Sequence, residues 1–136
     1  MNLRTPLARA RGLGSAKTGA EHWLAERITA IALVPLSLWF ALSLAGVAGA
    51  DYAAAVEWVG RPLNTILLVL FLLTAFYHAI MGVQVVMEDY IHDERAKLLS
   101  IILIRFALWL LAAGAVLAVL RVAFMPVVAG EAGGHG

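Results

Sequence analysis

The stretch PLNTILLVLFLLTAFYHAIMGVQVVM, residues 62–87, is 26 residues long and contains no Asp, Glu, Lys or Arg. Arg61 precedes it and Glu88 follows it. Crossing the hydrocarbon core of a bilayer as an α-helix takes about 20 apolar residues, so this stretch predicts a transmembrane helix. It nevertheless contains one titratable ring, His78, and a group of charged side chains begins where it ends.

Two more stretches have the same character. Residues 28–50 carry no charged side chain, and residues 98–120 carry only Arg105, whose long stem can extend toward the lipid headgroups. Over the whole chain 62% of residues are hydrophobic and 14% are charged, whereas ordinary globular proteins have about 45–50% apolar and about 25% charged residues. The sequence therefore predicts an all-α membrane protein with three transmembrane helices.

The composition along the chain suggests three parts. We expect residues 1–22 to form a basic cytoplasmic segment, residues 23–125 the three-helix membrane anchor, and residues 126–136 a flexible tail. The connection formed by residues 51–60 is too short for a further domain, and its Ala, Val and Trp residues favour a short helix on the outer membrane surface. The chain has no cysteine, which excludes disulfides, thiolate chemistry and cysteine-held iron–sulfur clusters.

Positive charges are distributed unevenly between the two sides of the predicted spans. Seven lie before the first span or between the second and third, and two lie on the opposite side. The seven are Arg4, Arg9, Arg11, Lys17, Arg27, Arg95 and Lys97, and the two are Arg61 and Arg121. Because cytoplasmic segments are enriched in Lys and Arg, this distribution predicts a cytoplasmic N-terminus and a periplasmic C-terminus.

A titratable ring inside a membrane span is costly, which makes His78 a candidate functional residue. At 100° per residue, Gly82 and Asp89 fall within about 40° of His78 on one stripe of the helix. Gly82 leaves room beside the imidazole for a flat ligand such as haem, and histidine is a standard axial ligand of haem iron. Two alternatives remain open: His78 hydrogen-bonds a neighbouring helix, and Gly82 allows helices to pack closely.

The other histidines, His22, His92 and His135, lie outside the three predicted spans. None is placed to reach the middle of the membrane within the same chain. If His78 binds haem, either the iron has five ligands or another polypeptide supplies the sixth. The second possibility predicts that the chain is a subunit of a larger complex.

Tyr90 lies twelve residues after His78, which is about 18 Å along a helix axis and reaches the cytoplasmic interface. The carboxylates near it belong to Glu88, Asp89, Asp93 and Glu94. One interpretation is a solvated loop with a tyrosine at the membrane interface. The other is a site where the phenol donates a hydrogen bond to a carbonyl, such as that of a quinone headgroup.

Two motifs resemble those of a known family. HAIMGVQVVMEDY, residues 78–90, resembles the second-span motif of the small membrane-anchor subunit of succinate dehydrogenase, with Gly four residues after His and Asp-Tyr at positions eleven and twelve. HWLAERITAI, residues 22–31, resembles the same family's entry to the first span, a histidine followed by Arg-x-Thr-Ala-Ile. The likeness covers about residues 14–97 and has three spans in the same order.

The resemblance implies a role for each matching residue. It implies that His78 is an axial ligand of haem b, with the second ligand on a partner cytochrome b anchor subunit. Tyr90 would hydrogen-bond a ubiquinone carbonyl, with Asp89 as the neighbouring acid. Arg27 would lie near the haem propionates, and His22, in a region of variable spacing, is a further candidate for the haem site.

The resemblance also implies partners. In a bacterial succinate–ubiquinone oxidoreductase, respiratory complex II, a flavoprotein subunit oxidises succinate as part of the tricarboxylic acid cycle and an iron–sulfur subunit passes the electrons to ubiquinone. This chain would provide half of the haem ligation, part of the quinone site and the attachment to membrane lipid. It has no dinucleotide-binding fingerprint or succinate-binding residues of its own, and no nucleic-acid partner is expected.

Several alternatives accompany this expectation. The anchor of a quinol:fumarate reductase has the same architecture with electrons running in the opposite direction. A non-catalytic helical assembly subunit or small transport component would bind neither haem nor quinone. An Arg-rich start without acidic residues before Glu21 is also typical of a mitochondrial transit peptide, although its short length favours a bacterial inner membrane.

Overall fold

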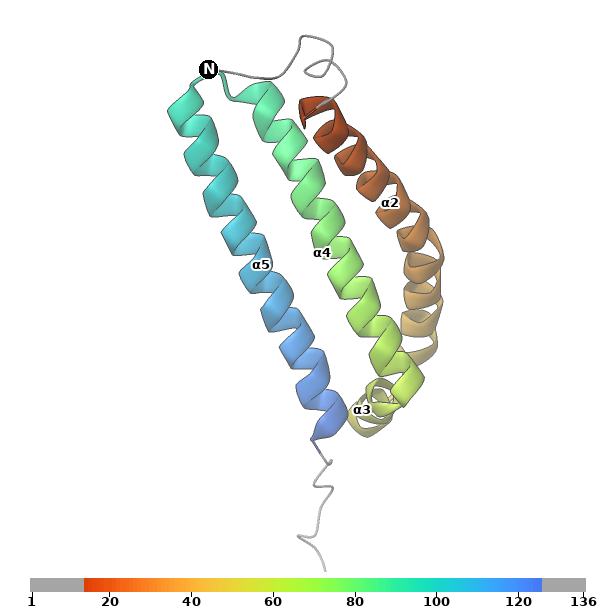
Figure 1. Cartoon of the computed structure of the whole chain (residues 1–136). Coiled ribbons are helices and arrows are strands. Elements are labelled where there is room, and N and C mark those ends of the chain that lie inside the picture. The colour runs from red at the N-terminus through yellow and green to blue at the C-terminus, as the bar shows by residue number, and fades with distance from the viewer. Residues whose placement is uncertain (1–13, 126–136) are drawn as a thin grey trace, which may run out of the picture.

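The computed structural model describes the backbone of residues 14–125 and the side chains of residues 18–125. Three long helices, α2 (Gly14–Val47), α4 (Pro62–Tyr90) and α5 (Glu94–Phe124), lie side by side, and the short α3 (Tyr52–Gly60) follows α2 at one end (Figure 1). The predicted all-α class is therefore confirmed over the described residues.

Each long helix is apolar enough to cross a membrane, with mean hydropathies of 2.1, 2.3 and 2.4. The candidate spans are Thr18–Val47, Pro62–Tyr90 and Glu94–Phe124, so the three predicted apolar stretches correspond to three helices. The helices extend beyond those stretches at charged ends. A charged side chain limits the depth of a residue in the bilayer, but the backbone hydrogen bonds of the helix continue through it.

Residues 14–22 of the predicted basic segment lie within α2. Residues 1–13 and the predicted tail, residues 126–136, lie outside the described residues. The predicted helix in the connection between the first two spans is present as α3.

Local chemistry explains where the last three helices begin. The Asp51 carboxylate accepts a hydrogen bond from the Ala54 N–H at 2.8 Å at the start of α3, and the Asp93 carboxylate accepts one from the Ala96 N–H at 2.8 Å at the start of α5. Both are N-caps that satisfy a free backbone donor. Pro62 begins α4, where a missing N–H removes no helical hydrogen bond.

α2 is curved in Figure 1, and Pro35 lies in its interior. A proline ring removes one backbone hydrogen bond and crowds the carbonyl one turn earlier, which bends a helix. Beyond Pro35 the helix is held by aromatic contacts. Trp39 stacks on Trp58 of α3 and Phe40 stacks on Phe71 of α4, with ring centroids 5.9 Å and 5.0 Å apart.

α4 is the central helix of the three. It contacts α2 on one side and α5 on the other, and α2 and α5 do not contact each other within the described residues. Most of the buried side chains of this part of the chain belong to α4, namely Thr65, Leu68, Ile80 and Met81. The residues with the strongest candidate roles, His78 to Tyr90, therefore lie on the helix that organises the fold.

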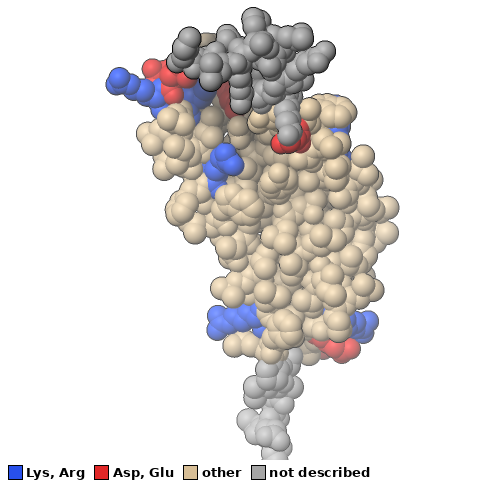
Figure 2. Space-filling model, viewed as in Figure 1, with Lys and Arg blue, Asp and Glu red and all other residues tan. Residues whose placement is uncertain are grey.

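The outer faces of the long helices are apolar and exposed. Figure 2 shows charged side chains mainly toward the two ends of the molecule and a broad uncharged surface between them. Ile31, Leu42 and Leu117 are more than 60% exposed. Lipid tails are as apolar as these side chains, so such faces need no protein cover in a bilayer.

Candidate functional site

His78 joins two of the long helices through a hydrogen bond. Its ring lies half-buried in α4, and Nδ1 is 2.9 Å from the Thr29 hydroxyl oxygen of α2. The same hydroxyl oxygen is 2.8 Å from the Ala25 carbonyl oxygen and 3.0 Å from that of Glu26. A polar contact therefore links α2 to α4 inside the apolar part of the chain.

This contact bears on the alternative in which His78 hydrogen-bonds a neighbouring helix. The bond to Thr29 exists, but it uses one of the two ring nitrogens. Within residues 18–125 it is the one hydrogen bond that the His78 ring makes, so Nε2 remains available to a group outside this chain. The structural role and a ligand role are therefore compatible.

Gly82 lies one turn after His78 on α4. A Cβ atom added at Gly82 would meet nothing within 4 Å apart from the adjoining backbone of α4. The glycine therefore does not serve a close approach between the described helices of this chain. The space beside it is open to a ligand or to another subunit.

Arg27 and His22 lie on α2 before Thr29. The Arg27 guanidinium carbon is 5.6 Å from the centroid of the Trp23 ring, a distance at which a cation is attracted to the ring face. The start of α2 lies beside the end of α4 in Figure 1. His22 and Arg27 are the ninth and fourteenth residues of α2, so both lie in the half of α2 that contains Thr29, the contact of His78.

Tyr90 is the last residue of α4, and its side chain is 79% exposed. Asp89 is exposed as well. The carboxylate of the preceding residue, Glu88, accepts a hydrogen bond from Gln84 at 2.8 Å. The described part of the chain does not enclose the Tyr90 ring, which leaves the phenol free to contact another molecule.

Thr29 is the member of this site to which the sequence assigns no role. It belongs to the HWLAERITAI motif, but its partner is 49 positions away in the chain. Threonine hydroxyls in helices commonly hydrogen-bond a backbone carbonyl three or four residues earlier. A threonine in the motif therefore does not by itself predict a contact with His78. No group of three or more His, Asp or Glu side chains in residues 18–125 is arranged to hold a metal ion.

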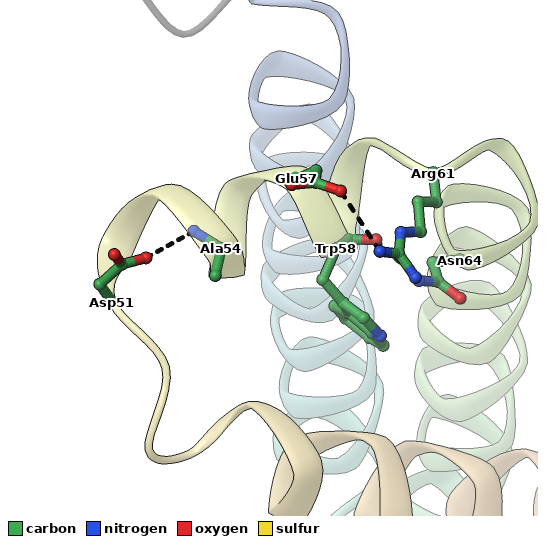
Figure 3. A network of polar contacts seen from close by, with 6 residues as sticks. All are labelled: Asp51, Ala54, Glu57, Trp58, Arg61 and Asn64. Carbon is green, nitrogen blue, oxygen red and sulfur yellow. Dashed lines mark hydrogen bonds and ion pairs between the residues drawn. The ribbon is translucent and has the colours of Figure 1, made fainter. Parts of the chain in front are cut away.

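The opposite end of the molecule contains a separate polar network (Figure 3). Arg61 donates a hydrogen bond to Glu57 at 3.3 Å, and the Asn64 amide donates one to the Trp58 carbonyl oxygen at 2.7 Å. The buried Thr65 hydroxyl donates to the Val59 carbonyl oxygen at 2.7 Å. The bonds from Asn64 and Thr65 satisfy two free carbonyls at the end of α3 and fix the turn between α3 and α4.

A hollow of about 560 Å³ lies beside this network. Its lining comes from α3, the start of α4 and the end of α5, and includes Glu57, Arg61 and Val122. It is open to the surroundings and lies at the end of α4 opposite to Tyr90. It is therefore a feature distinct from the His78 site.

The sequence matches, over residues 1–112, the family described as succinate dehydrogenase/fumarate reductase transmembrane subunit. The chain belongs to this family. The match includes both motifs, the Thr29–His78 pair and Tyr90. The family resemblance predicted from the motifs is thus confirmed.

Curated relatives agree with this assignment. The chain is 38% identical to the succinate dehydrogenase hydrophobic membrane anchor subunit of Rickettsia bellii over 104 residues, which are 76% of this chain and 83% of that protein. It is 31% identical to the protein of the same name from Paracoccus denitrificans over 121 residues, 89% of this chain and 93% of that protein. No solved structure matches the chain significantly.

Proposed function

We propose that this chain is the hydrophobic membrane anchor subunit of a succinate:ubiquinone oxidoreductase. In this proposal His78 supplies one axial ligand of haem b, and Tyr90 and Asp89 form part of the ubiquinone site. The observation that carries the haem proposal is the imidazole held at Nδ1 by Thr29 with Nε2 unused. The family membership supports the anchor role.

The residues around His78 fit a flat iron-containing ring. Open space beside Gly82 allows such a ring to approach the backbone of α4. When bound, haem b supplies an iron that takes up and releases one electron. The other described histidines, His22 and His92, lie outside the predicted spans, so in this proposal the second axial ligand would come from the partner cytochrome b anchor subunit.

Arg27 and His22 complete the proposed haem site on α2. Haem propionates are anions, and Arg27 carries a positive charge on α2 two residues before Thr29, which contacts His78. Its packing against Trp23 leaves the guanidinium N–H groups able to donate to a carboxylate. His22 lies five residues earlier on the same helix and would add a second donor.

Tyr90 provides the hydrogen-bond donor for ubiquinone. The quinone headgroup enters from the lipid, and the phenol O–H donates to one of its carbonyl oxygens as negative charge develops there. Asp89 orients the site or the iron–sulfur subunit that reduces the quinone. The flavoprotein subunit, which oxidises succinate, binds further from the membrane.

Two other functions are alternatives for this chain: the anchor of a quinol:fumarate reductase, and a subunit that binds neither haem nor quinone. A quinol:fumarate reductase anchor belongs to the same family and would use the same residues in the opposite direction. The curated relatives named above are called succinate dehydrogenase anchors, which favours succinate oxidation. The family membership counts against a non-catalytic assembly subunit or transport component.

The purified complex tests the haem proposal directly. We expect its dithionite-reduced visible spectrum to contain the absorption bands of a b-type haem with two axial ligands. One haem per copy of this chain is expected, because one His78 contributes one ligand. A purified, active complex without a haem signal would contradict the proposal.

We also propose that the N-terminus and the segment 1–22 are cytoplasmic, that residues 23–125 form the anchor and that the tail, residues 126–136, is periplasmic, in a bacterial inner membrane. The seven-to-two distribution of positive charge supports this orientation. A fluorescent protein fused before residue 1 should therefore fluoresce, and alkaline phosphatase fused after residue 136 should be active. Fluorescence from a C-terminal fusion would show that one of the three helices does not cross the membrane.

A further inference from the structure

Three polar atoms, each within hydrogen-bond distance of the next, connect the His78 ring to the backbone of α2. The His78 Nδ1 atom is 2.9 Å from the Thr29 hydroxyl oxygen, and that oxygen is 2.8 Å from the Ala25 carbonyl oxygen. A hydroxyl group has one proton to donate and two lone pairs to accept with. The Thr29 hydroxyl can therefore donate toward Ala25 or toward His78, but not toward both.

The direction of donation decides which imidazole nitrogen carries the proton. If Thr29 donates to the Ala25 carbonyl, its oxygen accepts from a protonated Nδ1, and Nε2 keeps a free lone pair. If Thr29 donates to Nδ1, the proton of the neutral ring is on Nε2, which then has no lone pair for a metal. The direction of this one hydrogen bond therefore decides whether the Nε2 lone pair of His78 is available to bind a metal.

The surroundings of Thr29 favour the first direction. Two backbone carbonyl oxygens, those of Ala25 and Glu26, lie within 3.0 Å of the hydroxyl oxygen. Each carbonyl has a second lone pair beyond the one used in the helix. If the Thr29 hydroxyl donates to these carbonyls, the lone pairs of its oxygen remain to accept from the His78 Nδ1–H. The hydroxyl, the carbonyl and Nδ1 then each have a hydrogen-bond partner.

We propose that Thr29 is a positioning residue that fixes the tautomer of His78, holding the proton on Nδ1 and leaving Nε2 free to bind haem iron. This inference rests on the proposed function. The hydrogen bond also fixes the ring relative to α2, the helix that carries Arg27 and His22. Partners that accept the second N–H of a metal-binding histidine raise the basicity of its ligand nitrogen.

The test is to replace Thr29 by valine in the full complex, since valine has the same shape and no hydroxyl. Loss of the acceptor leaves the tautomer of His78 free and makes Nε2 less basic. We expect haem to be retained about 10- to 100-fold more weakly, the range typical for lost partners of metal ligands. The midpoint potential of the remaining haem should rise, because a less basic ligand stabilises the oxidised iron less.

Two further variants separate the hydroxyl from general packing. Thr29→Ser keeps the hydroxyl and should restore both the haem retention and the potential. Thr65→Val is the control. It removes another hydroxyl of a membrane helix, one that donates to the Val59 carbonyl oxygen at 2.7 Å, and Thr65 lies thirteen residues before His78 on α4. It should leave the haem potential unchanged. If Thr29→Val does not assemble, Thr29→Ala replaces it, because the smaller side chain cannot clash with α4.

The outcomes distinguish this inference from the proposed function. If His78→Leu removes the haem but the hydroxyl-free Thr29 variant has wild-type retention and potential, the tautomer inference is wrong and the proposed function stands. A Thr29→Ser complex that behaves like the valine variant, or a Thr65→Val complex with the same shift in potential, also overturns the inference. A wild-type complex without haem overturns both.

Discussion

Replacing His78 by leucine should remove haem b from the complex while the chain remains inserted in the membrane. Leucine is apolar and about as large as the imidazole, so α4 keeps its hydropathy and its place between α2 and α5. Thr29 keeps its bond to the Ala25 carbonyl oxygen, so no buried polar group is left without a partner. The lost interhelical hydrogen bond costs about 0.6 kcal/mol, the average measured between membrane helices.

The measurement is the haem-to-protein ratio of the purified complex, from the reduced visible spectrum. His92→Leu is the matched control, because His92 is exposed and follows the end of α4. The control should keep a full haem content. An unchanged haem spectrum in His78→Leu would show that His78 is a packing group and that the haem ligands come from other chains.

Replacing Tyr90 by phenylalanine should lower quinone reduction while leaving succinate oxidation by an artificial acceptor nearly unchanged. The ring is 79% exposed, so its hydroxyl contributes little to the stability of this chain. Removing one donor that stabilises developing negative charge in an enzyme costs about 10²–10³ in rate. Because the site is at a wet interface where water can replace the donor, we expect a loss at or below the lower end of that range.

The measured quantity is the ratio of quinone-dependent to artificial-acceptor activity, which cancels differences in expression. Tyr52→Phe is the matched control: Tyr52 is 80% exposed, like Tyr90, but begins α3 at the opposite end of the molecule. Its ratio should equal that of the wild type. If Tyr90→Phe gives the same ratio as Tyr52→Phe, Tyr90 is an interfacial tyrosine and the quinone site lies on the partner subunits.

The number and type of the helices could be predicted from the sequence, because the bilayer acts on the chain locally. A charge-free run such as residues 62–87 has a favourable transfer free energy whatever surrounds it, and its backbone must form a helix to satisfy its hydrogen bonds. The same local reasoning identifies His78, since a titratable ring is conspicuous within an apolar run. The motif from His78 to Tyr90 indicates the family, and the match to that family over residues 1–112 confirms it.

Only the tertiary structure shows that Thr29 is the partner of His78 and that α4 lies between α2 and α5. In a soluble protein the buried face of a helix differs from its exposed face, and the sequence pattern reveals the rotation of each helix. Here the faces toward lipid and toward neighbouring helices are both apolar, so the sequence does not fix the rotation. The pairing of one hydroxyl with one ring nitrogen depends on that rotation, which is set by packing between residues far apart in the chain.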